Sequence, residues 1–354
     1  MAYTTINKST DYFNTKTYTG NGGTQALTGI GHQPDMVWVK SRGDGDGHKL
    51  FDAVRGALKV IEPNDNSAES TYANSLTSFD SDGFTVGSTA DMNDSGDTFV
   101  AWNWKAGTTG SGTTTGSGTG KAYSYSVNTT AGFSIVKWTG NGTAGHQIPH
   151  HLGVKPQIIF PKRLSDTADW LVGSDYLDTS IPWQKYLKLN TTDAVADGDN
   201  YADTVPTTSV FSVGDTGALN GNNDTYVAYC FASKTGYSKI GKYTGNGSTD
   251  GTFIYTGFKP AFLMTKRTDT TSEWVIFDNK RDSFNQVQKF LQPNSTSAEG
   301  NDNGTSSGKQ IDFLSNGWKM RGTTGGMNAS GGTYIYMAFG QSIVGSNNVP
   351  AVAR

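Results

Sequence analysis

A five-residue signature, in which an aromatic residue precedes Thr-Gly-Asn-Gly, occurs three times in this chain, and each occurrence opens the same longer pattern. The signatures begin at Tyr18, Trp138 and Tyr243. Each is followed by Gly-x-x-Pro, an apolar run and a basic pair, and each copy closes on an aromatic-rich stretch. The closing stretches are DTFVAWNW (Asp97 to Trp104), DTYVAYCF (Asp224 to Phe231) and GTYIYMAF (Gly332 to Phe339). Because these landmarks keep their order while the spacings vary, the chain is three copies of one folding unit.

Short β-branched and aromatic runs, bounded by Gly, Asn and Asp, predict strands throughout the chain. Clear examples are MVWVK from Met36, QIIFPK from Gln157 and AFLMTK from Ala261. The nearest candidate for a helix, Ser283 to Leu291, is too short to organise a domain. At 354 residues the chain exceeds what one hydrophobic core usually serves, and the 12% of aromatic residues supply burial for several small cores. We therefore predict an all-β fold of three tandem β-sandwich domains, lectin-like or jelly-roll-like.

The landmarks also set domain boundaries. We predict an N-terminal arm over residues 1–11, β-sandwich repeats over 12–106, 122–235 and 236–340, a linker over 107–121, and a C-terminal tail over 341–354. Residues 107–120 are only Gly, Ser and Thr, a composition typical of a flexible tether. The junction at 232–236 is short, so we expect the second and third repeats to form a rigid pair and the first to be placed separately.

The charge pattern excludes several classes of partner. A net charge of −3 with both signs scattered gives no basic stripe for nucleic acid. There is no long apolar run for a membrane, and the first ten residues lack the features of a signal peptide. The single cysteine, Cys230, lies in an apolar stretch, so we expect a small buried side chain rather than a nucleophile.

Several groups of polar residues are candidates for a ligand, catalytic or metal site. Asp52 and Arg55 form either a ligand or catalytic pair, which the second repeat lacks, or an ion pair that fixes a loop, which we favour. The Asp-rich stretches 91–97 and 43–48 suit turns better than calcium loops. His146, His150 and His151 lack the further ligands that a zinc site needs. We therefore predict neither a metal nor another cofactor.

The sequence contains no residue pattern typical of a catalytic site. The serines have no nucleophile-elbow context, and the positions that the three repeats share are Gly, Pro, Thr, aromatic and basic residues. We therefore predict a protein that is not an enzyme and has no catalytic residues. For binding, Trp170 and Trp183 in the divergent second repeat are candidates for stacking on sugar rings, with core packing as the alternative.

Taken together, YTGNG, GxxPDMVWVKSR, LFDAVRG, SFDSDGFTVG and GDTFVAWNWKAG in the first repeat resemble a module found in tail-fibre-like virion proteins of marine and aquatic tailed bacteriophages. The third repeat, with YTGNGSTDGTFIYTGFKPAFLMTKR, is similar to another copy of that module, and the resemblance covers residues 12–340. It implies a virion component with a lectin-like β-sandwich, assembled in the host cytoplasm beside other virion proteins. It carries no catalytic residues to transfer.

Two functions are consistent with this resemblance. The first is a short tail fibre or receptor-binding component that contacts host surface glycans. The second is a capsid decoration or cement protein that bridges virion subunits. By analogy with phage fibres, we also expect a homo-oligomer, a trimer in particular.

Overall fold

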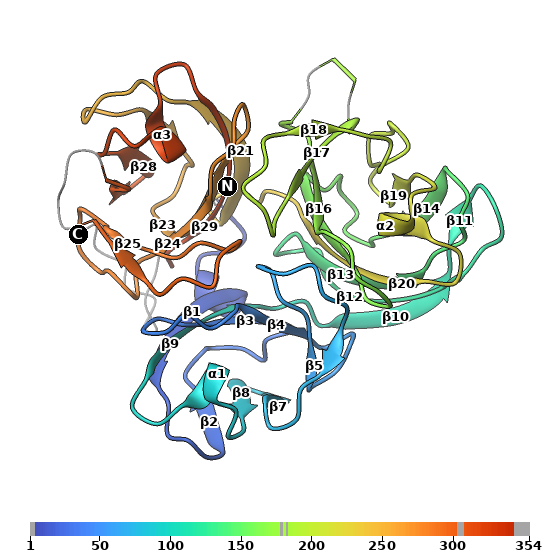
Figure 1. The fold of residues 1–354 in the computed structure, drawn as a ribbon, viewed down its shortest axis with the longest axis horizontal. Helices are drawn as coiled ribbons and strands as arrows, with labels where there is room; N and C mark the ends of the chain where they lie inside the picture. The colour runs from blue at the N-terminus through green and yellow to red at the C-terminus, as the bar shows by residue number, and fades with distance from the viewer. Residues whose placement is uncertain (1–3, 178–179, 182, 303–307, 343–354) are drawn as a thin grey trace.

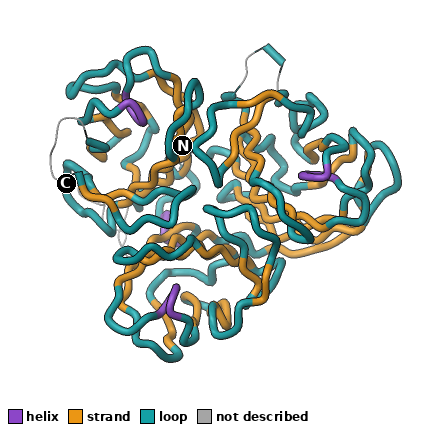
Figure 2. The backbone as a smooth tube through the Cα atoms, in the orientation of Figure 1, coloured by secondary structure: helices purple, strands orange, loops and turns teal. Residues whose placement is uncertain are grey.

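The computed structural model describes residues 4–177, 180–181, 183–302 and 308–342. Within them the chain forms many antiparallel strands and only very short helices, so the all-β prediction is confirmed. The parts of the three repeats within 12–106, 122–235 and 236–340 are here called copy one, copy two and copy three. Figure 2 shows that strands make up most of the regular structure of each copy and that the helices are short, isolated turns.

Copy one contains a four-stranded sheet, a three-stranded sheet and a two-stranded ribbon. The four-stranded sheet has the order β1 (Phe13–Thr19), β9 (Thr98–Trp104), β3 (Met36–Ser41) and β4 (Lys49–Asp52). The three-stranded sheet has the order β2 (Gln25–Thr28), β8 (Gly83–Val86) and β7 (Leu76–Asp80). The ribbon pairs β5 (Lys59–Val60) with β6 (Ser70–Thr71), and the helices are η1 (Ser9–Asp11), which precedes the copy, and α1 (Ala90–Asn93).

Copies two and three repeat this plan, and copy two extends it. Its eight-stranded sheet has the order β10 (Thr108–Thr113), β12 (Ala122–Asn128), β13 (Phe133–Thr139), β20 (Thr225–Phe231), β15 (Ile158–Arg163), β16 (Leu171–Ser174), β17 (Lys185–Lys188) and β18 (Ala196–Asp197). Its three-stranded sheet has the order β11 (Thr115–Gly116), β14 (His146–Pro149) and β19 (Val210–Val213), and its helix is α2 (Gly217–Asn220). The four-stranded sheet of copy three has the order β21 (Ser238–Thr244), β29 (Thr333–Gly340), β23 (Pro260–Arg267) and β24 (Trp274–Asp278). Its three-stranded sheet has the order β22 (Phe253–Tyr255), β28 (Gly317–Met320) and β27 (Ile311–Leu314). Its ribbon pairs β25 (Lys289–Phe290) with β26 (Gly300–Asn301), and its helix is α3 (Gly325–Asn328).

The sequence landmarks mark the same elements in every copy. The closing aromatic stretch forms the strand β9, β20 or β29, which pairs on one side with the strand that leads into the signature. On its other side it pairs with the apolar run after Gly-x-x-Pro. Each copy also has its own hydrophobic cluster, which draws residues from both its larger and its three-stranded sheet. Cys230 is buried in the cluster of copy two, as predicted.

The Thr-Gly-Asn-Gly signature is held by one buried asparagine at the end of each short helix. Those asparagines are Asn93, Asn220 and Asn328, all without exposed surface. In copy two, the Oδ1 atom of Asn220 accepts from the backbone N–H of Asn141 at 3.0 Å, and its Nδ2 atom donates to the backbone oxygens of Thr143 and Gly214. The first glycine, Gly140, lies so close to the Gly221 carbonyl that a Cβ would sit 2.3 Å from its oxygen, and the second, Gly142, has a φ of +71°. The signature is therefore a structural requirement of the fold.

The three copies share a fourth hydrophobic cluster at the centre of the molecule, where their larger sheets meet (Figure 1). One aromatic residue from each copy forms a triangle there. Trp104, Phe231 and Phe339 have ring centroids 6.3, 5.8 and 6.0 Å apart. A void of only about 20 Å³ remains beside them, lined by apolar and aromatic side chains. The void is too small and too apolar to hold a ligand.

The stretch expected to be a flexible tether forms strands instead. Thr108–Thr113 pairs along its whole length with β12, and Thr115–Gly116 pairs with β14. Gly, Ser and Thr do not build a core, but their backbones can pair with any exposed strand edge. The composition of a segment does not predict whether the fold places such an edge beside it. Copy one is not placed separately either. The Trp102 indole donates to Asp278 of copy three, and the Tyr229 phenol of copy two donates to Asp52.

The segment expected to be an N-terminal arm also joins the central cluster. Ile6 is buried there, and η1 follows directly. Of the predicted C-terminal tail over 341–354, only Gln341 and Ser342 lie within the described residues, where the backbone N–H of Gln341 donates to the Lys259 carbonyl at 2.7 Å.

Candidate functional site

Trp170 and Trp183, the residues proposed for stacking on sugars, both lie in the core. Trp170 has no exposed surface, and its indole N–H donates to the Glu62 carbonyl of copy one at 3.0 Å. Trp183 is 1% exposed, and its indole N–H donates to Asp175 at 2.9 Å. A sugar needs an open ring face, which neither residue offers in this structure. The alternative of core packing holds for both, since each ring is buried and each indole N–H has a partner inside the protein.

The Asp52–Arg55 pair is structural, as favoured from the sequence. Both side chains are buried, the guanidinium of Arg55 bonds to Asp52, and the Asp52 carboxylate also accepts from the backbone N–H groups of Val54 and Arg55. Copy three repeats the arrangement with Asp278 and Arg281, 2.6 Å apart. Copy two has Ser174 at the corresponding place. With all these bonds made inside the protein, neither carboxylate is presented to a ligand.

A buried lysine at the end of one strand recurs in all three copies. Lys40, Lys162 and Lys266 have no exposed surface, and burial lowers the pKa of each to about 8. Their ammonium groups donate to backbone carbonyls. Lys162 reaches Asn66 of copy one at 3.0 Å, and Lys266 reaches Thr192 of copy two at 3.2 Å. Lys162 and Lys266 therefore join neighbouring copies, whereas Lys40 donates to the Ser41 and Asp44 carbonyls of its own copy.

The histidine stretch in copy two is likewise engaged inside the protein. His146 bonds through both ring nitrogens, to Asn220 and to Thr114, and His150 bonds to the Thr207 carbonyl and accepts from the Leu152 N–H. Burial lowers the pKa of His150 to about 4. Among the described residues, no group of three His, Cys, Asp or Glu side chains is placed to hold a metal ion. No helix in the described part of the chain has the length and hydrophobicity to cross a membrane.

A larger opening exists in copy three, where one loop is longer than its counterpart. Three residues separate Arg55 from β5 in copy one, whereas seven separate Arg281 from β25, so the loop is four residues longer. The ribbons that follow are equivalent, because Leu50 bridges Ile61 just as Ile276 bridges Leu291. The extra residues therefore fall before the ribbon, in the segment 282–288.

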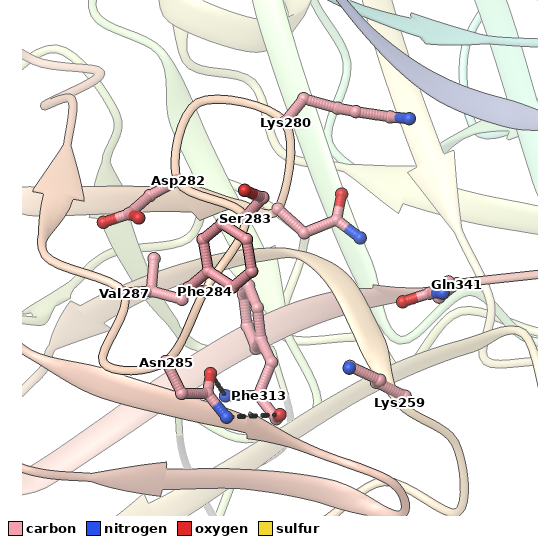
Figure 3. Close-up of a pocket in the computed structure, with 10 residues that line it drawn as sticks. Lys259, Lys280, Asp282, Ser283, Phe284, Asn285, Val287, Phe313 and Gln341 are labelled. Atoms are coloured by element: carbon pink, nitrogen blue, oxygen red, sulfur yellow. Dashed lines mark hydrogen bonds between the residues drawn. The ribbon is translucent and has the colours of Figure 1, made fainter. Parts of the chain in front are cut away.

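This longer loop forms one wall of a pocket of about 650 Å³ (Figure 3). Asn285 ties the loop to β27, because its Nδ2 atom donates to the Phe313 carbonyl at 3.0 Å and its Oδ1 atom accepts from the Phe313 N–H at 2.9 Å. The Asp282 carboxylate accepts from the backbone N–H of Gln288 at 2.8 Å. These bonds fix the loop without using the side chain of Phe284, which is 70% exposed.

The remaining lining residues give the pocket a polar and positive side. Lys259 and Gln341 lie across from the loop in Figure 3, and Lys280 extends from the chain just before it. Lysine and amide side chains donate hydrogen bonds to hydroxyl or anionic oxygens, and an open aromatic ring offers an apolar face beside them. A pocket that combines an aromatic ring with a few polar groups is a candidate binding site. The pocket therefore suits a polar ligand with an apolar face.

Sequence reasoning missed this pocket. The sequence offers Ser283 to Leu291 only as a candidate for a short helix, whereas the structure has a loop followed by β25. The signal that would have found it is the length difference between copies one and three after the arginine that each shares. A comparison of loop lengths between the copies identifies the segments that the common fold does not require, and such segments often carry function.

The fold and the pocket define a class: an all-β protein of three copies around one core, with an open pocket on the third. The chain belongs to a family described as a domain of unknown function (DUF7483), whose model matches residues 8–342. This one match spans all three copies, in keeping with their common central cluster. No curated protein and no solved structure matches the chain.

Proposed function

We propose that this protein is a non-enzymatic component of a tailed-phage virion, a short tail fibre or receptor-binding component that contacts host surface glycans. The observation that carries the binding role is the pocket of copy three, whose lining includes the exposed Phe284 ring together with lysine and amide side chains. A pyranose ring has an apolar face for Phe284 and hydroxyl groups for Lys280 and Gln341. The resemblance of the repeat landmarks to virion modules supports the place of action.

We further propose that each copy is a β-sandwich domain. In every copy a hydrophobic cluster takes side chains from both the larger and the three-stranded sheet, as two packed layers do. A homotrimer in the virion stays part of this proposal, and light scattering of the purified chain tests it: a monomer at micromolar concentration would remove it.

Binding of the full-length chain to an array of bacterial surface polysaccharides tests the glycan role. We expect Phe284→Ser to weaken binding at least tenfold, because the ring supplies the apolar contact. The matched control replaces Phe253 and Tyr255 by Ser. These rings are 44% and 56% exposed at another place in the same copy, and their loss should leave glycan binding unchanged. Glycan binding that survives Phe284→Ser would place the site elsewhere.

Cryo-electron microscopy of the intact particle tests the location. Density for this chain at the tail periphery, with the loop 282–288 directed outward, is the expected result. Density on the capsid lattice would instead make it a decoration or cement protein that bridges virion subunits, and the glycan role would fall.

A further inference from the structure

The strand that leads into the signature and the strand that follows it lie at equivalent places in each copy, and the space between them, here called the groove, is filled differently in the three copies. The strands are β1 and β2 in copy one, β13 and β14 in copy two, and β21 and β22 in copy three. One position at the floor of the groove is equivalent in all of them. It holds Lys16, Val136 and Gly241, which pair with matching residues of the closing strand.

In copy one a side chain crosses the groove. The ammonium group of Lys16, on β1, donates to the Thr28 carbonyl at the end of β2, and the two atoms are 2.8 Å apart. This bond links the two border strands directly.

In copy two a segment of backbone covers the groove. Strand β12 pairs with β13, and Tyr125 lies opposite Val136 in that register. The preceding strand β11 pairs with β14, so the chain runs from one border strand to the other. Tyr123 and Tyr125 pack against the hydrophobic cluster that contains Val136. The occupant of this groove is an extended segment of tyrosines and small residues.

In copy three the groove is open, with a volume of about 550 Å³. In the described part of the chain no strand pairs with the outer side of β21 or of β22. Gly241 stands at the floor, and Phe253 and Tyr255 are 44% and 56% exposed on β22. Such exposed aromatic rings beside two strand edges are costly in water unless they serve a contact.

We propose that the groove of copy three accepts an extended strand from a partner protein, as the groove of copy two accepts β11 and β12. Ser233 Oγ already accepts from the Ile240 N–H at 3.0 Å, so the incoming strand pairs with β21 over 241–244. Its aromatic side chains lie against Phe253 and Tyr255, beside the Tyr336 ring that already packs over Gly241. The residues that line the groove include Lys239 and Lys242 and no carboxylate, so the segment is neutral or acidic. Addition of a strand to a sheet edge is a common mode of recognition.

The probe is a synthetic peptide with the sequence of residues 107–128, the segment that occupies copy two, carrying Lys121→Gln so that it has no charged side chain, added to the full-length chain. We expect saturable binding, with slowed amide hydrogen exchange at 241–244 and 253–255. Replacing Phe253 and Tyr255 by Ser should weaken binding at least tenfold. Phe284→Ser, which removes a more exposed ring outside the groove, should not change it.

A peptide in which Tyr123 and Tyr125 are replaced by Ser should bind at least tenfold more weakly, because the tyrosines fill the groove. The proposal is overturned if the peptide fails to bind at millimolar concentration, or if protection appears only at β13 and β14 of copy two. Equal losses with Phe284→Ser and with the Phe253, Tyr255 variant would also overturn it. Since the glycan test depends on Phe284 and this one on Phe253 and Tyr255, either proposal can fail alone.

Discussion

Asn93, Asn220 and Asn328 each hold the signature turn of their copy through a buried side-chain amide. Asn220 has no exposed surface, accepts from the Asn141 N–H and donates to two backbone carbonyls. Removing one partner of a buried hydrogen bond leaves the other unpaired, at about 1–3 kcal/mol for each group. One residue thus connects the signature to the short helix and to the strand before it.

We therefore expect Asn220→Ala to lower the free energy of unfolding by about 3 kcal/mol, since it leaves several buried backbone groups unpaired. Urea unfolding followed by tryptophan fluorescence measures the change. Asn222→Ala is the control, because this neighbouring asparagine is exposed in the following turn. A loss for Asn220→Ala no larger than that for Asn222→Ala would contradict the role assigned to the buried amide.

Buried histidines make the protein sensitive to acid. Burial lowers the pKa of His32 and of His150 from 6.5 to about 4. Between these values the unfolded chain binds more protons than the folded one, so stability present at neutral pH is lost as the pH falls from 6.5 to 4. Each residue contributes about 3 kcal/mol to that loss.

We expect the midpoint of thermal unfolding to fall steeply between pH 6.5 and pH 4, and less steeply in the double variant His32→Gln, His150→Gln. Differential scanning calorimetry over this range measures both curves. The same slope in the two proteins would show that other groups control acid stability. His151→Gln serves as the control, because this histidine is less buried.

At the scale of elements, the sequence predicted strands wherever apolar and aromatic runs meet turn residues, and it misjudged the segment that has neither. The closing stretch from Thr98 to Trp104 forms the predicted strand, β9. Residues 107–120 contain no apolar side chain, so their pairing depends wholly on the edges of β12 and β14, which only the assembled fold provides. The pocket loop 282–288 was not predicted for a similar reason, because it is an insertion in copy three and not part of the pattern that the copies share.

Amide hydrogen exchange tests the strand β10. We expect alternate amides in Thr108–Thr113 to exchange at least a hundredfold more slowly than in a free peptide of the same sequence, because they bond to β12. A flexible tether would exchange at the rates of the free peptide, and that result would contradict the strand.

At the scale of the molecule, the central cluster makes one body of three copies. Trp104 contributes to it from copy one and lies against Phe231 of copy two and Phe339 of copy three. Trp138 is equally buried but lies inside the cluster of copy two alone. These two residues separate the stability of the assembly from that of a single copy.

We expect Trp104→Ala to cost about 3–5 kcal/mol and to speed hydrogen exchange at the contacts of all three copies. Trp138→Ala should cost a similar amount but speed exchange mainly within copy two. Exchange measured by mass spectrometry distinguishes the patterns. If Trp104→Ala affected copy one alone, the copies would be energetically independent despite their contact.

The triangle of Trp104, Phe231 and Phe339 closes a ring whose three members belong to one covalent chain. Docking of the copies is therefore intramolecular, and dilution does not separate them. Three identical subunits around an axis must present the same surface three times. The three copies of a single chain can differ in sequence. Copy two therefore lacks the Asp–Arg pair, copy one bridges its groove with a lysine, and copy three keeps an open groove and a pocket.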